Sequence, residues 1–155
     1  MLSRWTVVAA ATALAACSSG TDATTPVSVS VVVGPTANAT GVSRTGPITL
    51  DAGMSMDTAS CSGRMLLHTG DSTGPLVAAH MTWDNGNRRM ILQPNAMLAP
   101  MTTYFVHVRD SMMTSASGGM MTGTMSGMRP MMFDQPPAGG MRMGDGMAWT
   151  FTTGP

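Results

Sequence analysis

Residues 103–109, TYFVHVR, form the clearest candidate strand in the chain, because they are almost entirely β-branched, aromatic or otherwise suited to a pleated surface. Six further short stretches share an apolar or alternating character and are separated by Gly, Pro, Asn and Asp turn signals: 27–31, 48–50, 65–67, 76–83, 90–92 and 147–153. About seven short strands with no helical stretch predict an all-β fold, a sandwich of two antiparallel sheets.

The composition supports strands and excludes one class of partner. The chain has 155 residues, enough for one domain, and its 8 basic residues balance its 8 acidic ones. Every base is Arg and every acid is Asp, so the straight-chain helix formers Lys and Glu are missing. No basic field exists to attract nucleic acid. The 19 methionines are far above ordinary usage.

The N-terminus reads as an export signal. In residues 1–17, MLSRWTVVAAATALAAC, Arg4 precedes an apolar run that is too short to span a bilayer. The ending LAAC resembles the lipobox of bacterial lipoproteins. This resemblance implies that residues 1–16 are removed, that Cys17 carries lipid, and that 17–25 form a flexible tether. The protein would then be exported and membrane-anchored, in the outer membrane, periplasm or cell surface. In the alternative, the signal is simply cleaved and Cys17 is incidental.

Residues 111–146 differ from the rest of the chain, since they consist largely of Met, Gly, Ser, Thr and Pro. Glycine and proline pairs disfavour regular structure there. We expect one long loop inserted before the last strand, and loops of this length are usually functional or disordered.

Four motifs in order resemble the bacterial Ig-like domain of the SbsA type: GVSRTGPITL at 41–50, MDTAS at 56–60, LQPNAMLAPMTTY at 92–104 and WTFTT at 149–153. The resemblance implies one Ig-like sandwich over residues 26–155, in a family that serves mainly as spacer and adhesion modules. It also implies that Tyr104, Val106 and Val108 face the core while His107 faces solvent. Met97 and Met101 stand where the family typically has Pro and Gly.

The methionines suggest a candidate soft-metal site. Thioether sulfur favours Cu(I) and Ag(I) over Zn, Mg and Ca. Spacings in 111–146 are similar to the Met-rich segments of periplasmic copper-handling proteins. In an Ig sandwich the loops after the second and sixth strands emerge at one end, so residues near 54–61 should join the insert. The candidate ligands are Met54, Met56, Cys61, Met112, Met113, Met120, Met121, Met125, Met128, Met131, Met132, Met141 and Met143.

Other interpretations of the Met-rich stretch remain open. It could be a contact surface for an envelope protein, because Met-rich surfaces adapt to varied partners. It could belong to an adhesion or spacer module with no ligand. It could also be an oxidant sink, in which methionine cycles to its sulfoxide.

We expect no enzyme. The sequence lacks a Gly-x-Ser-x-Gly elbow, a His-Glu-x-x-His zinc motif and a phosphate loop. The three histidines, His68, His80 and His107, are placed on different predicted strands or faces. Asp51 and Asp57 are interpreted as turn and loop-capping residues.

Overall fold

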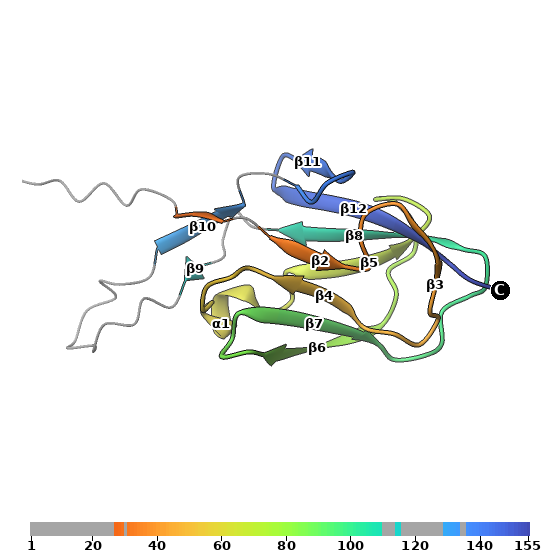
Figure 1. The fold of residues 1–155 in the computed structure, drawn as a ribbon, viewed down its shortest axis with the longest axis horizontal. Helices are drawn as coiled ribbons and strands as arrows, with labels where there is room; N and C mark the ends of the chain where they lie inside the picture. The colour runs from red at the N-terminus through yellow and green to blue at the C-terminus, as the bar shows by residue number, and fades with distance from the viewer. Residues whose placement is uncertain (1–26, 30, 110–113, 116–128, 134–135) are drawn as a thin grey trace, which may run out of the picture.

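The computed structural model describes residues 27–29, 31–109, 114–115, 129–133 and 136–155, and its body is a β-sandwich (Figure 1). The first sheet has the order β2-β4-β7-β6, built from Val32–Gly34, Ile48–Asp51, Arg89–Pro94 and Ala79–Asp84. The second has the order β11-β12-β8-β5, built from Met141–Met143, Gly146–Thr153, Thr103–Arg109 and Met65–Thr69. The strand β3 (Ala39–Val42) pairs with β12 in parallel. The all-β sandwich predicted from the sequence is confirmed.

The pairing of β8 with β12 organises the core. In this antiparallel register Val108 lies opposite Met147, and Val106 lies opposite Trp149. Directly opposite residues share a face of the sheet, and every one of these four side chains is fully buried. Tyr104, also predicted to face the core, stacks on its cross-strand partner Phe151 with ring centroids 5.7 Å apart.

The first sheet contributes the other half of the core through its alternating strands. Ile48 and Leu50 of β4 lie opposite Leu92 and Met90 of β7, and these four are almost fully buried. Met65 is buried as well, while Met81 is half-buried and packs against the core. These three methionines, Met65, Met81 and Met90, therefore serve as ordinary hydrophobic packing.

Several short elements add detail that the sequence pattern did not indicate. The one described helix, α1 (Thr58–Cys61), begins after Asp57, whose carboxylate accepts hydrogen bonds from the backbone N–H of Ala59 and Ser60. A third small sheet joins β1 (Val27–Val29), β10 (Arg129–Phe133) and β9 (Thr114–Ser115). Residues 111–146 thus hold β9, β10 and β11 instead of lying wholly outside strands.

No helix in the described part of the chain has the length and apolar character needed to cross a membrane. The predicted signal peptide, Cys17 and the tether lie outside the described residues.

Candidate functional site

The segment 52–64 and the end of β8, which precedes the Met-rich stretch in the sequence, lie at the same end of the sandwich. The strand β4 ends there at Asp51 and β8 ends there at Arg109, beside α1 (Figure 1). The backbone N–H of Arg109 donates to the carbonyl oxygen of Arg64 at 2.9 Å, which ties the two segments together. We call this the α1 end. The sandwich topology predicted this juxtaposition.

The three candidate ligands of the α1 end differ in exposure. Met56 and Cys61 are fully buried and belong to the core, whereas Met54 is half-buried and packs against it. The segment is held by the β6–β7 turn, because Met56 N–H donates to Asn87 O at 2.9 Å. The Ser55 hydroxyl donates to Gly86 O at 3.0 Å in the same place. Met54 is thus the sulfur of this group nearest to solvent.

The remaining candidate ligands divide into three groups. Met112, Met113, Met120, Met121, Met125 and Met128 lie outside the described residues. Met131 and Met132 belong to β10, where they pair with Val27 and Ser28 of β1. Met141 and Met143 lie in β11, the first 47% exposed and the second half-buried. The assignment of all these sulfurs to one ion stays a prediction.

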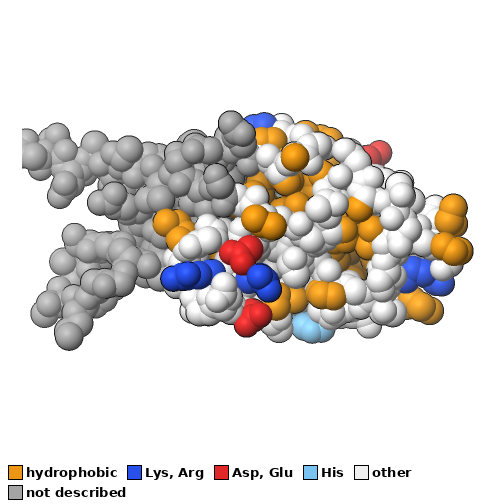
Figure 2. Space-filling model, viewed as in Figure 1, with side chains coloured by type: hydrophobic (Ala, Val, Ile, Leu, Met, Phe, Trp, Pro, Cys, Tyr) orange, Lys and Arg blue, Asp and Glu red, His pale blue; other side chains and the backbone are white. Residues whose placement is uncertain are grey.

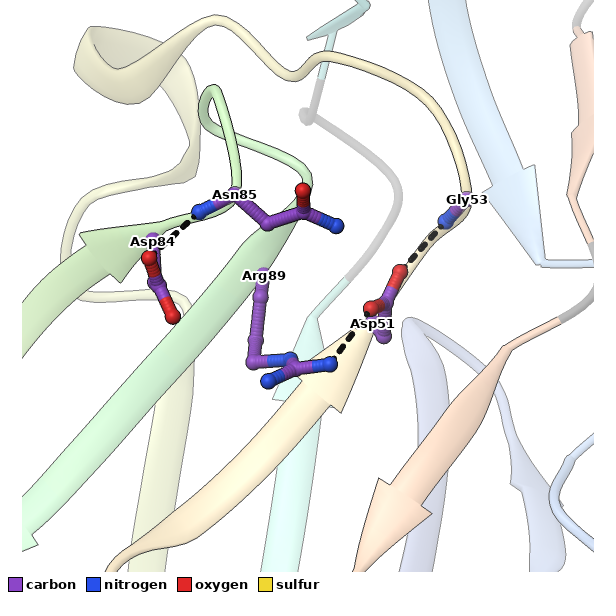
Figure 3. Close-up of polar contacts among 5 residues, drawn as sticks. All are labelled: Asp51, Gly53, Asp84, Asn85 and Arg89. Atoms are coloured by element: carbon purple, nitrogen blue, oxygen red, sulfur yellow. Dashed lines mark hydrogen bonds and ion pairs between the residues drawn. The ribbon is translucent and has the colours of Figure 1, made fainter.

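The carboxylates at the α1 end already have partners. Asp51 forms an ion pair with Arg89 at 3.1 Å and also accepts the Gly53 N–H at 2.9 Å (Figure 3). Asp57 caps α1. Both therefore have the turn and capping roles expected from the sequence, while the Asp51–Arg89 pair was not foreseen. The carboxylates of Asp51 and Asp57 are thus engaged by these contacts.

The prediction that His107 faces solvent is wrong. Its residue is 7% exposed, and its Nε2 lies 3.0 Å from Asp145 Oδ1. The reason is that β11 pairs with β12, so the turn between them places Asp145 against the outer face of β8. Asp145 also lies 3.4 Å from Arg109 Nε. The turn residues 144–146, Gly-Asp-Gly, were the one sequence signal for this hairpin.

The three histidines do not meet, as expected. His68 Nδ1 lies 3.0 Å from Gly74 O, and the exposed His80 has its Nδ1 3.0 Å from Asn95 Oδ1. Among the described residues, no group of three or more His, Cys, Asp or Glu side chains could hold a metal ion.

The opposite end of the sandwich carries two exposed methionines in the loop between β7 and β8. Met97 is 62% exposed and Met101 is 71% exposed. Met101 has φ +49°, in the left-handed region that favours glycine. This conformation explains why a glycine would suit that position, and it makes Met101 a locally strained residue.

These features define a bacterial sandwich of the immunoglobulin type. The model of the bacterial Ig-like domain family matches residues 22–153, which is most of the chain. The protein therefore belongs to the bacterial Ig-like domain family, as its motifs indicated. No curated protein sequence matches the chain.

Solved structures show a weak similarity to the chain. CopC from Methylosinus trichosporium OB3b is 18% identical with a TM-score of 0.45, over 82% of this chain and 94% of that one. L,D-transpeptidase 1 of Mycobacterium tuberculosis is 18% identical with a TM-score of 0.41, over 52% of this chain and 36% of that one. Domains 1–6 of surface layer protein SbsC are 12% identical with a TM-score of 0.42, over 81% and 14%. The chain thus spans well under half of two of these structures, and likenesses this weak indicate no function.

Proposed function

We propose that this protein is a non-catalytic lipoprotein of the cell envelope whose Ig-like domain binds a soft metal ion, Cu(I) or Ag(I), at the α1 end. The observation that carries the proposal is the hydrogen bond from Arg109 to Arg64 at 2.9 Å. It joins the last residue of β8, after which the Met-rich stretch follows in the sequence, to the segment 52–64 that contains Met54. In the proposal, thioethers from these two parts of the sequence meet at this end.

The chemistry of the available donors favours a soft ion. A thioether carries no proton and no charge, and it binds Cu(I) and Ag(I) in preference to hard cations. Asp51 and Asp57, the carboxylates of the segment 51–64, are engaged by Arg89 and by the first turn of α1. Met54 would make the contact from the rigid sandwich, and the methionines of 111–146 would supply the other sulfurs.

Met56 and Cys61 belong to the core cluster against which Met54 packs. Their burial gives them a packing role whether or not an ion is bound. An ion would contact Met56 or Cys61 only if it sat against the core. A substitution at Met54 is therefore the more direct test of the proposal.

The membrane attachment rests on the sequence at Cys17 and is compatible with family membership. The strand β1 begins at Val27 and pairs with β10, so the predicted tether joins the domain next to the Met-rich stretch. Changing Cys17→Ser should abolish lipidation, which mass spectrometry of the wild-type and variant proteins would measure. Acyl-free wild-type protein would contradict the lipoprotein assignment.

Metal binding is tested by competing the purified protein against a coloured Cu(I) chelator. Met54→Leu keeps the bulk and apolarity of the side chain and removes the sulfur, and it should weaken Cu(I) retention. Replacing the methionines of 111–146 by Leu should abolish retention. Met97→Leu is the matched control, because Met97 lies at the opposite end and is exposed.

If the leucine variants hold Cu(I) and Ag(I) as well as the wild type, the metal proposal is wrong. An adhesion or spacer module, the role that the family resemblance implies, then takes its place. If wild-type protein binds neither ion but protects other proteins from peroxide, the Met-rich stretch is an oxidant sink.

A further inference from the structure

Among the described strands, β6 is an edge of the first sheet with β7 as its one partner, at the lower margin of the sandwich in Figure 1. The backbone N–H of Asn95 donates to Ala78 O at 2.9 Å. In the β6–β7 register these two residues lie opposite each other, so this bond determines which residues of β6 direct their backbone groups toward β7. The backbone groups of His80, Thr82 and Asp84 consequently face β7. Those of Ala79, Met81 and Trp83 face outward, away from the sheet.

This edge lacks the features with which edge strands usually prevent pairing. Its sequence, AHMTWD, contains no Pro and no Lys, and β6 pairs with β7 along its whole length without a register shift. Beside it lies a groove of ≈ 350 Å³ between the two sheets, whose lining includes Met81 of β6 and Met65 of β5. A sheet edge next to a groove is suited to strand addition.

The side chains of β6 are arranged so that two antiparallel copies of the strand would complement each other. His80, Thr82 and Asp84 are exposed on the outer face, with Thr82 midway between a basic and an acidic group. His80 uses Nδ1 toward Asn95, which leaves Nε2 directed elsewhere. Asp84 uses Oδ1 to accept the Asn85 N–H at 2.7 Å, which leaves Oδ2 (Figure 3). Figure 2 shows a histidine and an acidic side chain along this lower margin.

We propose that β6 pairs antiparallel with β6 of a second copy of this chain, about a two-fold axis that passes through Thr82. Backbone hydrogen bonds between the two copies form only where residues whose backbone groups point away from β7 lie opposite one another. Met81 would therefore pair with the partner's Trp83. The same register places His80 opposite the partner's Asp84. By symmetry each contact occurs twice.

Polar complementarity selects this register from its neighbours. A two-fold axis at Met81 would place His80 opposite the partner's Thr82. An axis at Trp83 would place Asp84 opposite the partner's Thr82. Only the axis at Thr82 places the imidazole of His80 opposite a carboxylate, with which it can form a hydrogen bond, or an ion pair when the imidazole is protonated. Met81 and the partner's Trp83 would add a thioether–aromatic contact on the inner face.

The proposed interface is small. Each of the two pairs of outward-facing residues exchanges two backbone hydrogen bonds, and few side chains are covered. Interfaces below about 1,200 Å² are typical of weak or transient association. The dimer should therefore form reversibly and increase with protein concentration. This inference is independent of metal binding, and neither outcome depends on the other.

A cysteine at the two-fold axis gives the first test. Thr82 would face the partner's Thr82 as a non-hydrogen-bonded pair, with Cβ atoms about 4.5–5.5 Å apart, close enough for a disulfide after small adjustment. The full-chain variant Thr82→Cys should form a covalent dimer on mild oxidation. Thr40→Cys, an exposed threonine of β3, is the matched control, and wild-type protein measures any background from Cys17. Equal cross-linking of Thr82→Cys and Thr40→Cys would overturn the proposal.

Introducing a charge at the two-fold axis gives the second test. Thr82→Lys and Thr82→Asp each place like charges against each other in the homodimer, so sedimentation should show monomers for either variant alone. An equimolar mixture should recover dimers, because Lys then faces Asp. Circular dichroism establishes that both variants are folded. Wild-type protein that stays monomeric at every concentration, or a mixture that fails to recover dimers, would contradict the proposed register.

Discussion

The imidazole Nε2 of His107 lies 3.0 Å from Oδ1 of Asp145, and this contact joins the turn between β11 and β12 to the outer face of β8. The His107 side chain is 10% exposed, whereas the Asp145 side chain is 48% exposed. Asp145 thus reaches from the surface to satisfy a buried nitrogen, and the hairpin is fixed to the sandwich by this bond.

Removing the carboxylate should destabilise the domain. Asp145→Ala leaves the buried nitrogen of His107 without its partner, which should lower the free energy of unfolding by about 1–2 kcal/mol. Asp145→Asn, which retains a hydrogen-bonding side chain of the same size, should cost less. Denaturant unfolding measures both. Equal losses for the two variants would show that the hydrogen bond is not the source of the effect.

Gly146 should tolerate no side chain. A Cβ at this position would lie 1.8 Å from the backbone oxygen of Val108, so β8 and β12 would have to separate. Gly146→Ala should destabilise the protein by about 2–4 kcal/mol. Gly144→Ala is the matched control two residues away, because a Cβ there meets nothing within 4 Å. A thermal melt that shows similar losses for both would contradict the close approach.

Met101→Gly should stabilise the protein or leave it unchanged. The left-handed conformation at φ +49° costs a residue with a side chain about 1–2 kcal/mol, and glycine gives back about 0.5–1 kcal/mol in unfolded-state entropy. The net gain should therefore be between zero and about 1.5 kcal/mol. Met97→Gly at a position without positive φ should instead lose stability. Denaturant unfolding distinguishes the two substitutions.

The exposed carboxyl of Asp71 has its pKa lowered, chiefly because the Thr73 hydroxyl and backbone N–H donate to it at 2.7 and 2.8 Å. A lowered pKa contributes stability that is present above the unfolded pKa and is lost as the pH falls through the folded pKa. The loss of this stability on acidification is confined to pH values near and below 3.8. Thr73→Ala should raise the Asp71 pKa toward its usual value, as measured by NMR titration. An unchanged titration would exclude the Thr73 hydroxyl as the main cause.

The pH dependence of Cu(I) binding should reveal which sulfurs hold the ion. Thioethers do not exchange protons, so a site made by Met54 and the methionines of 111–146 should retain its affinity from about pH 7 to pH 5. A thiolate ligand would bind more weakly as the pH falls, because the unperturbed pKa of a thiol is about 8.5. Chelator competition at both pH values measures this. A steep loss at pH 5 that Cys61→Ser removes would place the thiolate among the ligands.

The main strands could be predicted from the sequence by their alternating or β-favouring residues. Residues 48–50 alternate between apolar and polar side chains, and residues 103–109 are rich in β-branched and aromatic side chains. The structure places strands at both. The strands β3 and β11 could not be found in this way, since they add to β12 through backbone hydrogen bonds and their side chains are mainly exposed. The error at His107 follows from missing β11, because the turn from β11 to β12 carries the Asp145 that contacts His107.

The position of the segment 52–64 was predictable, and the burial of its side chains was not. The topology of the sandwich brings this segment to the same end as Arg109, the last residue of β8, whatever the side chains are. Burial is different, because it depends on local packing: α1 turns Cys61 into the core, and the bond from Met56 to Asn87 draws Met56 inward. No periodicity in residues 52–61 distinguishes these two from the half-buried Met54.

The parallel pairing of β1 with β10 has a consequence for orientation at the bilayer. A tether of residues 17–25 can extend about 30 Å at most, and it would enter the domain at Val27, next to the Met-rich stretch. A lipid at Cys17 would therefore hold the sulfur-rich end toward the membrane and direct Met97 and Met101 away from it. Ions released at the membrane surface would meet the thioethers first, while the far end would remain open to other molecules of the envelope.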